Sequence, residues 1–379
     1  PELAPVMSAT FMAIPSLAVT CYAVYIRSDL PVREMNELES LGWRSFFASQ
    51  LDADVALAPA RVLAVHRGRV EVAGEDFHDS LPLTGNSAVL AITVGDWVLV
   101  DKDGPRVERV LDRFGVFKRG AAGTSNTIQL IAANIDTLFI VTSANRDFNV
   151  ARLERYLAIA HEAGAYPLIV ITKADTVESI EPYVSGARAL GTNLPVEAID
   201  AREPGDVDKL RPWCGPGQTV ALLGSSGVGK STLINTLAGA GLDTRDVRED
   251  DQRGRHTTTS RSMHRLPQGG WLVDTPGMRE LRLVDSAGAL DDVFGEITAL
   301  AADCRFSDCR HQAEPGCAVL AAIDAGVLDQ QRLDRFRKLQ AEDRRNSETV
   351  AERRARDRNL GQLYKSILSG KERLKGGNE

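Results

Sequence analysis

The sequence predicts a multidomain protein, in which an N-terminal β-barrel precedes a central α/β P-loop domain and a C-terminal α-helical zinc-binding domain. Three observations predict this order. Short β-type runs separated by glycines occupy residues 60–118. From Ile128 onward, buried strands alternate with helices, which is typical of a mostly parallel sheet covered on both faces. A cluster of cysteines and one histidine follows near residue 310.

The length of 379 residues allows two or three domains. We expect an N-terminal extension over 1–50, with 1–34 poorly ordered, and the barrel over 51–118. The P-loop domain is expected over 119–285 and the zinc-binding domain, with a basic helical tail, over 286–379.

Composition narrows the class of protein. The net charge of -7 argues against indiscriminate coating of nucleic acid, although residues 331–379 hold 14 Lys and Arg against 8 Asp and Glu. The five cysteines are odd in number and partly clustered, which favours a reducing cytoplasm over a secreted disulfide framework. The apolar run from Thr10 to Ile26 is interrupted by Pro15 and lacks a basic leader, so we expect no membrane association. A cleaved or membrane-associated leader remains the alternative for 1–34.

A short amphipathic helix is expected over 36–51, before the β-type runs. The β-type runs that follow are Ala60–His66, Arg69–Ala73, Ser87–Ile92 and Trp97–Val100. Small barrels of this kind often bind RNA or DNA, but aromatic stacking platforms are scarce here. A purely structural barrel is therefore an equal alternative.

The P-loop is the strongest motif in the chain. The apolar strand Val220–Leu223 leads into Gly224-x4-Gly229-Lys230-Ser231, and a helix is expected over 232–237. Glycines let backbone N–H groups approach phosphate oxygens, and the helix N-terminus adds a positive dipole. Lys230 would reach the β/γ-phosphates and Ser231 would bind Mg²⁺. The expected phosphate-binding residues are Gly224, Ser225, Ser226, Gly227, Val228, Gly229, Lys230, Ser231 and Thr232.

A second motif predicts guanine as the base. The strands 137–142 and 167–171 flank a helix over 152–163, and the second strand ends in Thr172, Lys173, Ala174 and Asp175. Asp175 can accept hydrogen bonds from N1–H and N2–H₂ of guanine, which adenine cannot donate. Many GTPases carry Asn where Thr172 stands. The next strand, 195–199, ends near Asp200 and is a weaker candidate for a second wall of the base pocket.

Two candidate switch segments follow the P-loop. The charged loop 242–262 contains His256 and is expected to be disordered without ligand. A threonine in it would complete the Mg²⁺ shell; we expect Thr258, with Thr257 or Thr259 as alternatives. The strand before Asp274-Thr-Pro-Gly277 places Asp274 to hold Mg²⁺ through water and the Gly277 N–H to bond the γ-phosphate.

Met278 stands where many GTPases place a water-orienting Gln. A methionine cannot orient water by hydrogen bonding, so intrinsic hydrolysis should be slow or another polar group must act. His256 is the tentative catalytic candidate beside Lys230. The motifs also occur in an unusual order, because the base-recognition motif comes first. The same sheet can form when the chain termini lie at a different surface loop. The order of the motifs therefore predicts a circularly permuted domain.

The C-terminal region carries Cys304-x4-Cys309-x-His311-x5-Cys317. Three thiolates and one imidazole make a closed tetrahedral set for structural zinc, which we favour over free or redox thiols. A charged helical pattern runs over 330–358. Its basic residues would either contact RNA or form a solvated helix face.

Together these residues resemble the RsgA/YjeQ family of circularly permuted GTPases, from about Gly42 to about Arg345. The resemblance includes Val94-Gly95-Asp96-Trp97-Val98 and Ala133-Asn134-Ile135-Asp136. It implies an OB-fold for the barrel and a cytoplasmic, monomeric factor that binds the small (30S) ribosomal subunit and its rRNA late in assembly. GTP would be hydrolysed to GDP when the subunit stimulates the protein. The resemblance does not extend to residues 1–34 or to the basic tail.

Two other functions remain open. One is an RNA-binding assembly protein whose nucleotide site is mainly structural. The other is a P-loop ATPase with a non-ribosomal partner.

Overall fold

The computed structural model describes residues 35–51, 57–83, 89, 91–120, 128–239, 261–274, 278, 281, 283–284 and 286–347. The N-terminal residues 1–34, the candidate switch residues His256, Thr257, Thr258, Thr259 and Gly277, and the tail 348–379 lie outside these ranges. Among the described helices, none combines the length and apolar character that a membrane span needs.

The N-terminal part is a β-rich region, as predicted. β1 pairs antiparallel with β2 and β4, β2 pairs with β3, and β4 pairs with β5. Alternating valines and other apolar side chains of these strands form a separate core. The strands are β1 (Ala58–His66), β2 (Arg69–Gly74), β3 (Phe77–Pro82), β4 (Trp97–Asp101) and β5 (Arg106–Val110).

Two local predictions in this region are wrong. Residues 36–51 form two short helices, α2 (Glu37–Ser40) and α3 (Ser45–Ala48), instead of one. Gly42 between them has φ of +96°, a left-handed conformation that ends a helix. The run 87–92 is not a strand where it is described, because Val89 is helical and Ala91 lies in a turn. Val89 and Ile92 nevertheless pack into the β-region core.

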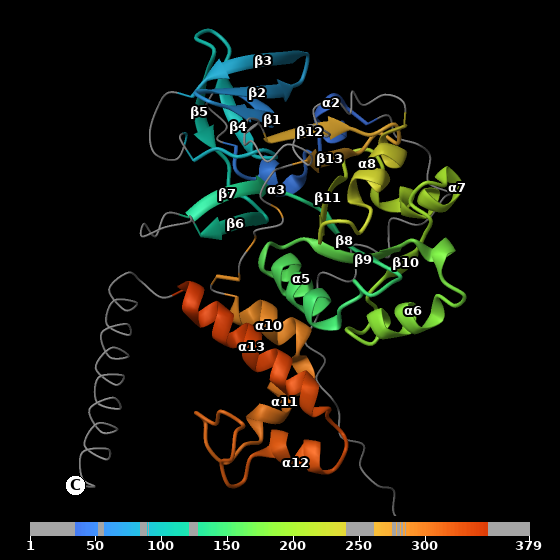
Figure 1. Cartoon of the computed structure of the whole chain (residues 1–379). Coiled ribbons are helices and arrows are strands. Elements are labelled where there is room, and N and C mark those ends of the chain that lie inside the picture. The colour runs from blue at the N-terminus through green and yellow to red at the C-terminus, as the bar shows by residue number, and fades with distance from the viewer. Residues whose placement is uncertain are drawn as a thin grey trace, which may run out of the picture. The chain divides into compact units, whose positions relative to one another are not determined.

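The central sheet is the predicted parallel sheet. Its strands run in the order β10-β9-β8-β11-β13, each parallel to its neighbour. β12 then pairs antiparallel with β13 and also with β1, so one 11-stranded sheet continues into the N-terminal region (Figure 1). The bounds are β8 (Thr137–Ser143), β9 (Tyr166–Thr172), β10 (Val196–Ala198), β11 (Thr219–Gly224), β12 (Arg261–Arg265) and β13 (Trp271–Asp274).

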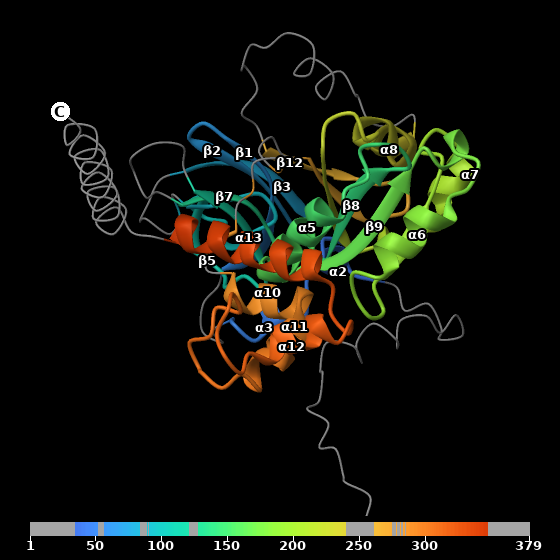
Figure 2. The ribbon, with the colours of Figure 1, turned by 60° about the horizontal axis from the view of Figure 1, so that its bottom comes forward.

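Helices cover both faces of this sheet, as expected for buried parallel strands (Figure 2). Alternate residues of β8 divide between the two faces: Leu138 and Ile140 join the core with α5, whereas Phe139 and Val141 join the core with α8. The elements concerned are α5 (Val150–Glu162), α6 (Glu181–Arg188), α7 (Pro204–Val207), η2 (Asp208–Trp213) and α8 (Lys230–Ala238). A separate antiparallel hairpin, β6 (Val116–Gly120) and β7 (Ile128–Ala133), precedes β8.

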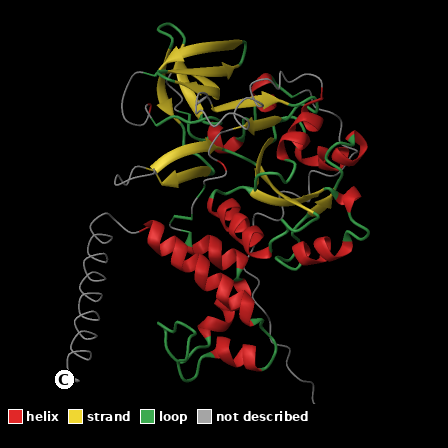
Figure 3. Cartoon of the chain, in the orientation of Figure 1, coloured by secondary structure: helices red, strands yellow, loops and turns green. Residues whose placement is uncertain are grey.

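The C-terminal part is helical (Figure 3). It comprises α10 (Ala287–Val293), α11 (Gly295–Ala302), α12 (Ala318–Asp324) and α13 (Gln330–Ser347). α13 contacts α5 through a fully buried carboxylate: Glu154 accepts hydrogen bonds from Arg332 at 2.7 Å and from Arg335 at 2.8 and 2.9 Å. These two arginines therefore serve helix packing, and they do not form part of an exposed RNA-binding face.

Candidate nucleotide and metal sites

The P-loop lies where the strand order reverses. From β8 the chain moves outward through β9 and β10, then returns to β11 on the other side of β8. Ligands of open α/β sheets bind at such a switch point, beyond the carboxyl ends of the strands. Gly224 ends β11 there, and an added Cβ would lie 2.3 Å from the carbonyl oxygen of Val141 on β8. Gly229, with φ of +96°, directs the chain into α8 at Lys230.

Two lysine ammonium groups donate hydrogen bonds to backbone carbonyls of the P-loop. The Lys230 ammonium donates to the carbonyl oxygens of Gly224, at 2.7 Å, and Ser225. The Lys173 ammonium, from the end of β9, donates to the Gly227 carbonyl at 2.9 Å. The second contact brings the Thr172–Asp175 motif against the P-loop, although 54 residues separate Lys173 from Gly227.

Thr172 occupies the position where many GTPases have asparagine. Its side chain is fully buried, and the hydroxyl lies 3.0 Å from the Thr142 carbonyl and within hydrogen-bond distance of the Val228 carbonyl. A threonine thus connects β8, β9 and the P-loop, as an asparagine amide at this position could also do.

Asp175 lies in the short 3-10 helix η1 (Ala174–Thr176), which Lys173 separates from the end of β9. Its Oδ2 accepts a hydrogen bond of 2.7 Å from Arg202, and Arg202 also contacts both oxygens of Asp200. Sequence reasoning identified Asp175 and Asp200 but missed Arg202. No motif marks an arginine four residues beyond the end of β10, and only the fold brings it to Asp175.

The second switch is only partly described. Asp274 ends β13, adjacent to β11 in the sheet, which is the position expected for a residue near Mg²⁺. Met278 is 5% exposed and belongs to the hydrophobic core, so its side chain packs instead of facing solvent. Gly277 and the candidate residues His256 to Thr259 lie outside the described ranges, so their roles remain predictions.

Beyond this switch, Leu281, Leu283, Val284 and Ser286 form what we call the post-switch segment. α5 and α13 hold it from two sides. Arg155 on α5 donates to the Leu281 carbonyl at 2.7 Å and also pairs with Glu342 on α13. Asn346 on α13 donates to the Leu283 carbonyl at 2.8 Å.

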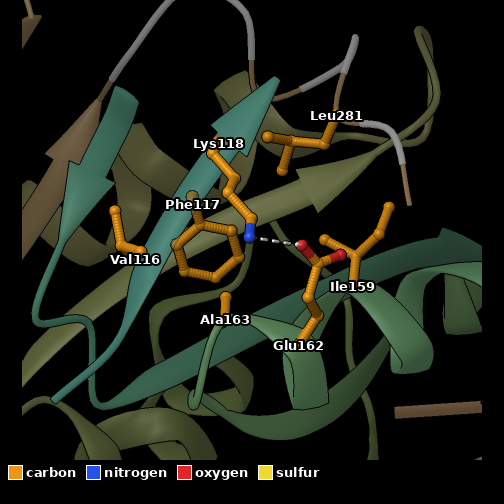
Figure 4. A pocket seen from close by; sticks show the side chains of 7 residues that line it. All are labelled: Val116, Phe117, Lys118, Ile159, Glu162, Ala163 and Leu281. Atoms are coloured by element: carbon orange, nitrogen blue, oxygen red, sulfur yellow. Dashed lines mark ion pairs between the residues drawn. The ribbon is translucent and has the colours of Figure 1, made fainter. Parts of the chain in front are cut away.

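A small pocket lies between β6, α5 and the post-switch segment (Figure 4). Phe117 and Leu281 contribute apolar side chains, while Lys118 points to Glu162 with 3.5 Å between Nζ and Oε1. Burial raises the pKa of Glu162, against the opposing effects of the Ser286 hydroxyl and Lys118. The pocket therefore contains a partly desolvated carboxyl that also contacts the segment behind the switch.

The four residues of the cysteine–histidine motif converge. Their ligand atoms all lie within 4.8 Å of one another. Tetrahedral zinc with ordinary bond lengths requires sulfur–sulfur separations of about 3.8 Å and sulfur–nitrogen separations of about 3.6 Å. The Cys304 and Cys317 sulfurs are 3.8 Å apart, and His311 Nδ1 lies 3.6 and 3.4 Å from them. Together with Cys309, this set fits a metal ion.

Glu314 organises the metal loop and was not identified from the sequence. Its carboxylate accepts hydrogen bonds from the backbone N–H groups of Arg310, Gln312 and Ala313, at 3.0, 2.7 and 3.1 Å. Backbone N–H groups, its own included, lower the pKa of Glu314 to about 2. The carboxylate thus fixes the backbone on both sides of His311, which has a left-handed φ of 55°.

Comparisons with known proteins bear on these sites. The family model described as RsgA GTPase matches residues 110–284. A small ribosomal subunit biogenesis GTPase RsgA 2 of Vibrio parahaemolyticus is 47% identical over 353 residues, covering 90% of this chain and 96% of the relative. The RsgA protein of Mesorhizobium japonicum is 51% identical over 315 residues, covering 82% of this chain and 91% of the relative.

The chain belongs to the RsgA GTPase family.

This membership confirms the resemblance that the motifs indicated and the enzyme class, a GTP hydrolase. Two solved structures agree in fold. The crystal structure of YjeQ from Thermotoga maritima gives a TM-score of 0.57 at 24% identity, covering 75% of this chain and 97% of that one. The crystal structure of YloQ, a circularly permuted GTPase, gives a TM-score of 0.53 at 20% identity. This match covers 79% of this chain and 99% of that one. The RsgA fold therefore accounts for the permuted order of the motifs.

Proposed function

We propose that this RsgA-family protein binds GTP between its P-loop and the Thr172–Asp175 motif and hydrolyses it in the cytoplasm during assembly of the small ribosomal subunit. The contact between Lys173 and the Gly227 carbonyl carries the proposal, because it joins the base-recognition motif to the phosphate-binding loop. Asp175 would select guanine, and the residues 224–232 would bind the phosphates.

Lys230 would leave the P-loop carbonyls and stabilise the charge that develops on the transferred phosphoryl group. Mg²⁺, when bound, neutralises phosphate charge; Ser231, with Thr258 as the expected switch threonine, would hold it, and Asp274 would orient a water of its shell. With Met278 buried, the attacking water needs another polar group, for which His256 is the candidate in sequence.

The cysteine–histidine loop is proposed to bind one structural Zn²⁺ and to contact rRNA. Phe306 is 42% exposed, and the Arg305 guanidinium lies 5.5 Å from its ring centroid. Arg310 is also exposed on this loop. An exposed aromatic ring beside two arginines suits stacking on an unpaired base and contact with phosphates.

The post-switch segment would couple these two activities. It follows the second switch in the chain and is hydrogen-bonded to α13, which packs against the other C-terminal helices. A movement of the switch that depends on the γ-phosphate would therefore reach the C-terminal part by a short path.

Nucleotide-dependent retention on small subunits tests the proposal. Purified protein is sedimented with 30S subunits in the presence of a non-hydrolysable GTP analogue, GDP or an ATP analogue. We expect strong co-sedimentation only with the GTP analogue. Equal retention with every nucleotide would favour an assembly protein with a structural nucleotide site.

Base selection is tested with Asp175→Asn, which should shift nucleotide preference from guanine to xanthine. A wild-type protein that binds ATP as well as GTP would instead indicate a P-loop ATPase.

A further inference from the structure

Arg202 joins the two carboxylates at the end of neighbouring strands. Its Nε and Nη2 lie 3.0 and 2.9 Å from the two oxygens of Asp200, a side-on bidentate pair. The same Nη2 lies 2.7 Å from Oδ2 of Asp175. These contacts use the Nε hydrogen and both Nη2 hydrogens, so the guanidinium geometry satisfies all three interactions at once.

The loop that carries Arg202 is fixed independently of the ion pairs. The Ala174 N–H donates to the Ile199 carbonyl at 3.3 Å, which connects the base-recognition motif to the end of β10. The Thr236 hydroxyl donates to the Ala201 carbonyl at 2.7 Å, which connects α8 to the same loop. The Asp200 N–H donates to Asp206 at 2.9 Å. Arg202 therefore extends from a rigid loop toward Asp175.

Asp175 can hold Arg202 and a guanine base together. A carboxylate offers about four lone-pair sites, and guanine N1–H and N2–H₂ require one on each oxygen. Arg202 uses one site on Oδ2, so the carboxylate keeps an acceptor site on each oxygen. Without Arg202, the charges of Asp175 and Asp200 would repel each other, and repulsion would grow when a base excluded water from the site.

We propose that Arg202 is a positioning residue for guanine recognition: bridged to Asp200, it holds the Asp175 carboxylate in the orientation that faces the base. The inference rests on the proposed role of Asp175. Asp175 and Asp200 side chains are 35% and 22% exposed, so the bridge contributes little to folding and should act mainly on nucleotide binding.

The test compares binding of GDP and of inosine diphosphate, which lacks the 2-amino group, by calorimetry. Arg202→Ala should weaken GDP binding about five- to tenfold and lower the GDP-to-IDP affinity ratio. Arg202→Lys should retain only part of the GDP affinity that Arg202→Ala loses, because an ammonium cannot bridge the two carboxylates with the same planar geometry. Arg211→Ala, which removes a separate exposed pair with Asp208, is the matched control and should leave both affinities unchanged.

A second substitution separates positioning from general damage. If Arg202 acts by neutralising Asp200, Asp200→Asn added to Arg202→Ala should restore most of the lost GDP affinity. Equal weakening of GDP and IDP with no rescue would overturn the inference, as would unchanged GDP binding by Arg202→Ala. A wild-type protein without preference for GDP over ADP would contradict the proposed function itself, so the two failures are distinguishable.

Discussion

The carboxylate of Asp343 on α13 accepts a hydrogen bond of 2.9 Å from the backbone N–H of Ser286, and both residues are almost fully buried. Ser286 ends the post-switch segment, and its hydroxyl also donates to Glu162 on α5 at 2.7 Å. The segment behind the second switch is thus joined to the C-terminal helix and to the sheet-covering helix through one residue.

Removing the acceptor at position 343 should destabilise the protein. Asp343→Ala leaves the Ser286 N–H buried and unpaired, so we expect the free energy of unfolding to fall by about 1–3 kcal/mol. Denaturant-induced unfolding measures this change. Asp343→Asn keeps an acceptor oxygen, so it should lower the free energy of unfolding clearly less than Asp343→Ala does. If the Ala and Asn variants both unfold like the wild type, the contact has no structural role.

Substitution of Glu154 should lower the free energy of unfolding more than substitution of Asp343. Its buried carboxylate is the shared partner of Arg332 and Arg335, so Glu154→Ala leaves two largely buried guanidinium groups without it. Breaking such a buried arrangement costs about 3–5 kcal/mol. Urea unfolding should show this loss, whereas Glu108→Ala, in an exposed pair with Arg106, should leave the free energy of unfolding nearly unchanged. Similar small effects of both substitutions would contradict the packing described.

The metal loop should depend on Glu314 although this residue is not a ligand. Glu314→Ala removes the acceptor of three loop N–H groups, so the ligands lose their preset geometry. We expect zinc to transfer to a chromogenic chelator about tenfold faster or more than from the wild type. Asp324→Ala, on exposed α12 surface, is the control. Equal transfer rates for wild type and Glu314→Ala would exclude an organising role.

Glu162 predicts a pH dependence of stability. Its pKa is raised by burial, so between the ordinary glutamate pKa and the raised value the folded protein holds a proton that the unfolded chain releases. Stability from this group is therefore present at low pH and is lost as pH rises through that window. The neighbouring His161, whose pKa burial lowers, acts in the opposite direction.

Comparison of wild type with Glu162→Gln isolates the glutamate, because His161 and the other groups titrate in both proteins. Lys118 and Ser286, which face Glu162, also remain in both. We expect the unfolding free energy of the wild type to decline relative to the variant as pH rises above the ordinary glutamate range. A difference that is constant with pH would contradict this assignment.

The nucleotide motifs could be predicted because their chemistry is local. Gly224 to Thr232 must follow a strand and open a helix, and Asp175 must follow a neighbouring strand, so spacing alone places them. The metal ligands could be predicted for the same reason, since three cysteines and one histidine lie close together in the sequence.

Other features depend on contacts between distant parts of the chain. The antiparallel pairing of β12 with β1 joins residues near 262 to residues near 64, and no local pattern indicates it. Arg202 reaches Asp175 only because β9 and β10 are neighbours. The helix over 36–51 was predicted wrongly because the apolar spacing outweighed Gly42, whose left-handed backbone ends the first turn.

The most direct test of the proposed function is steady-state turnover of GTP and of ATP by purified protein, alone and with small ribosomal subunits. We predict slow intrinsic GTP hydrolysis, strong stimulation by the subunit, little ATP turnover and loss of stimulated turnover in Lys230→Ala. Equal hydrolysis of ATP, or GTP turnover that does not respond to the subunit, would contradict it.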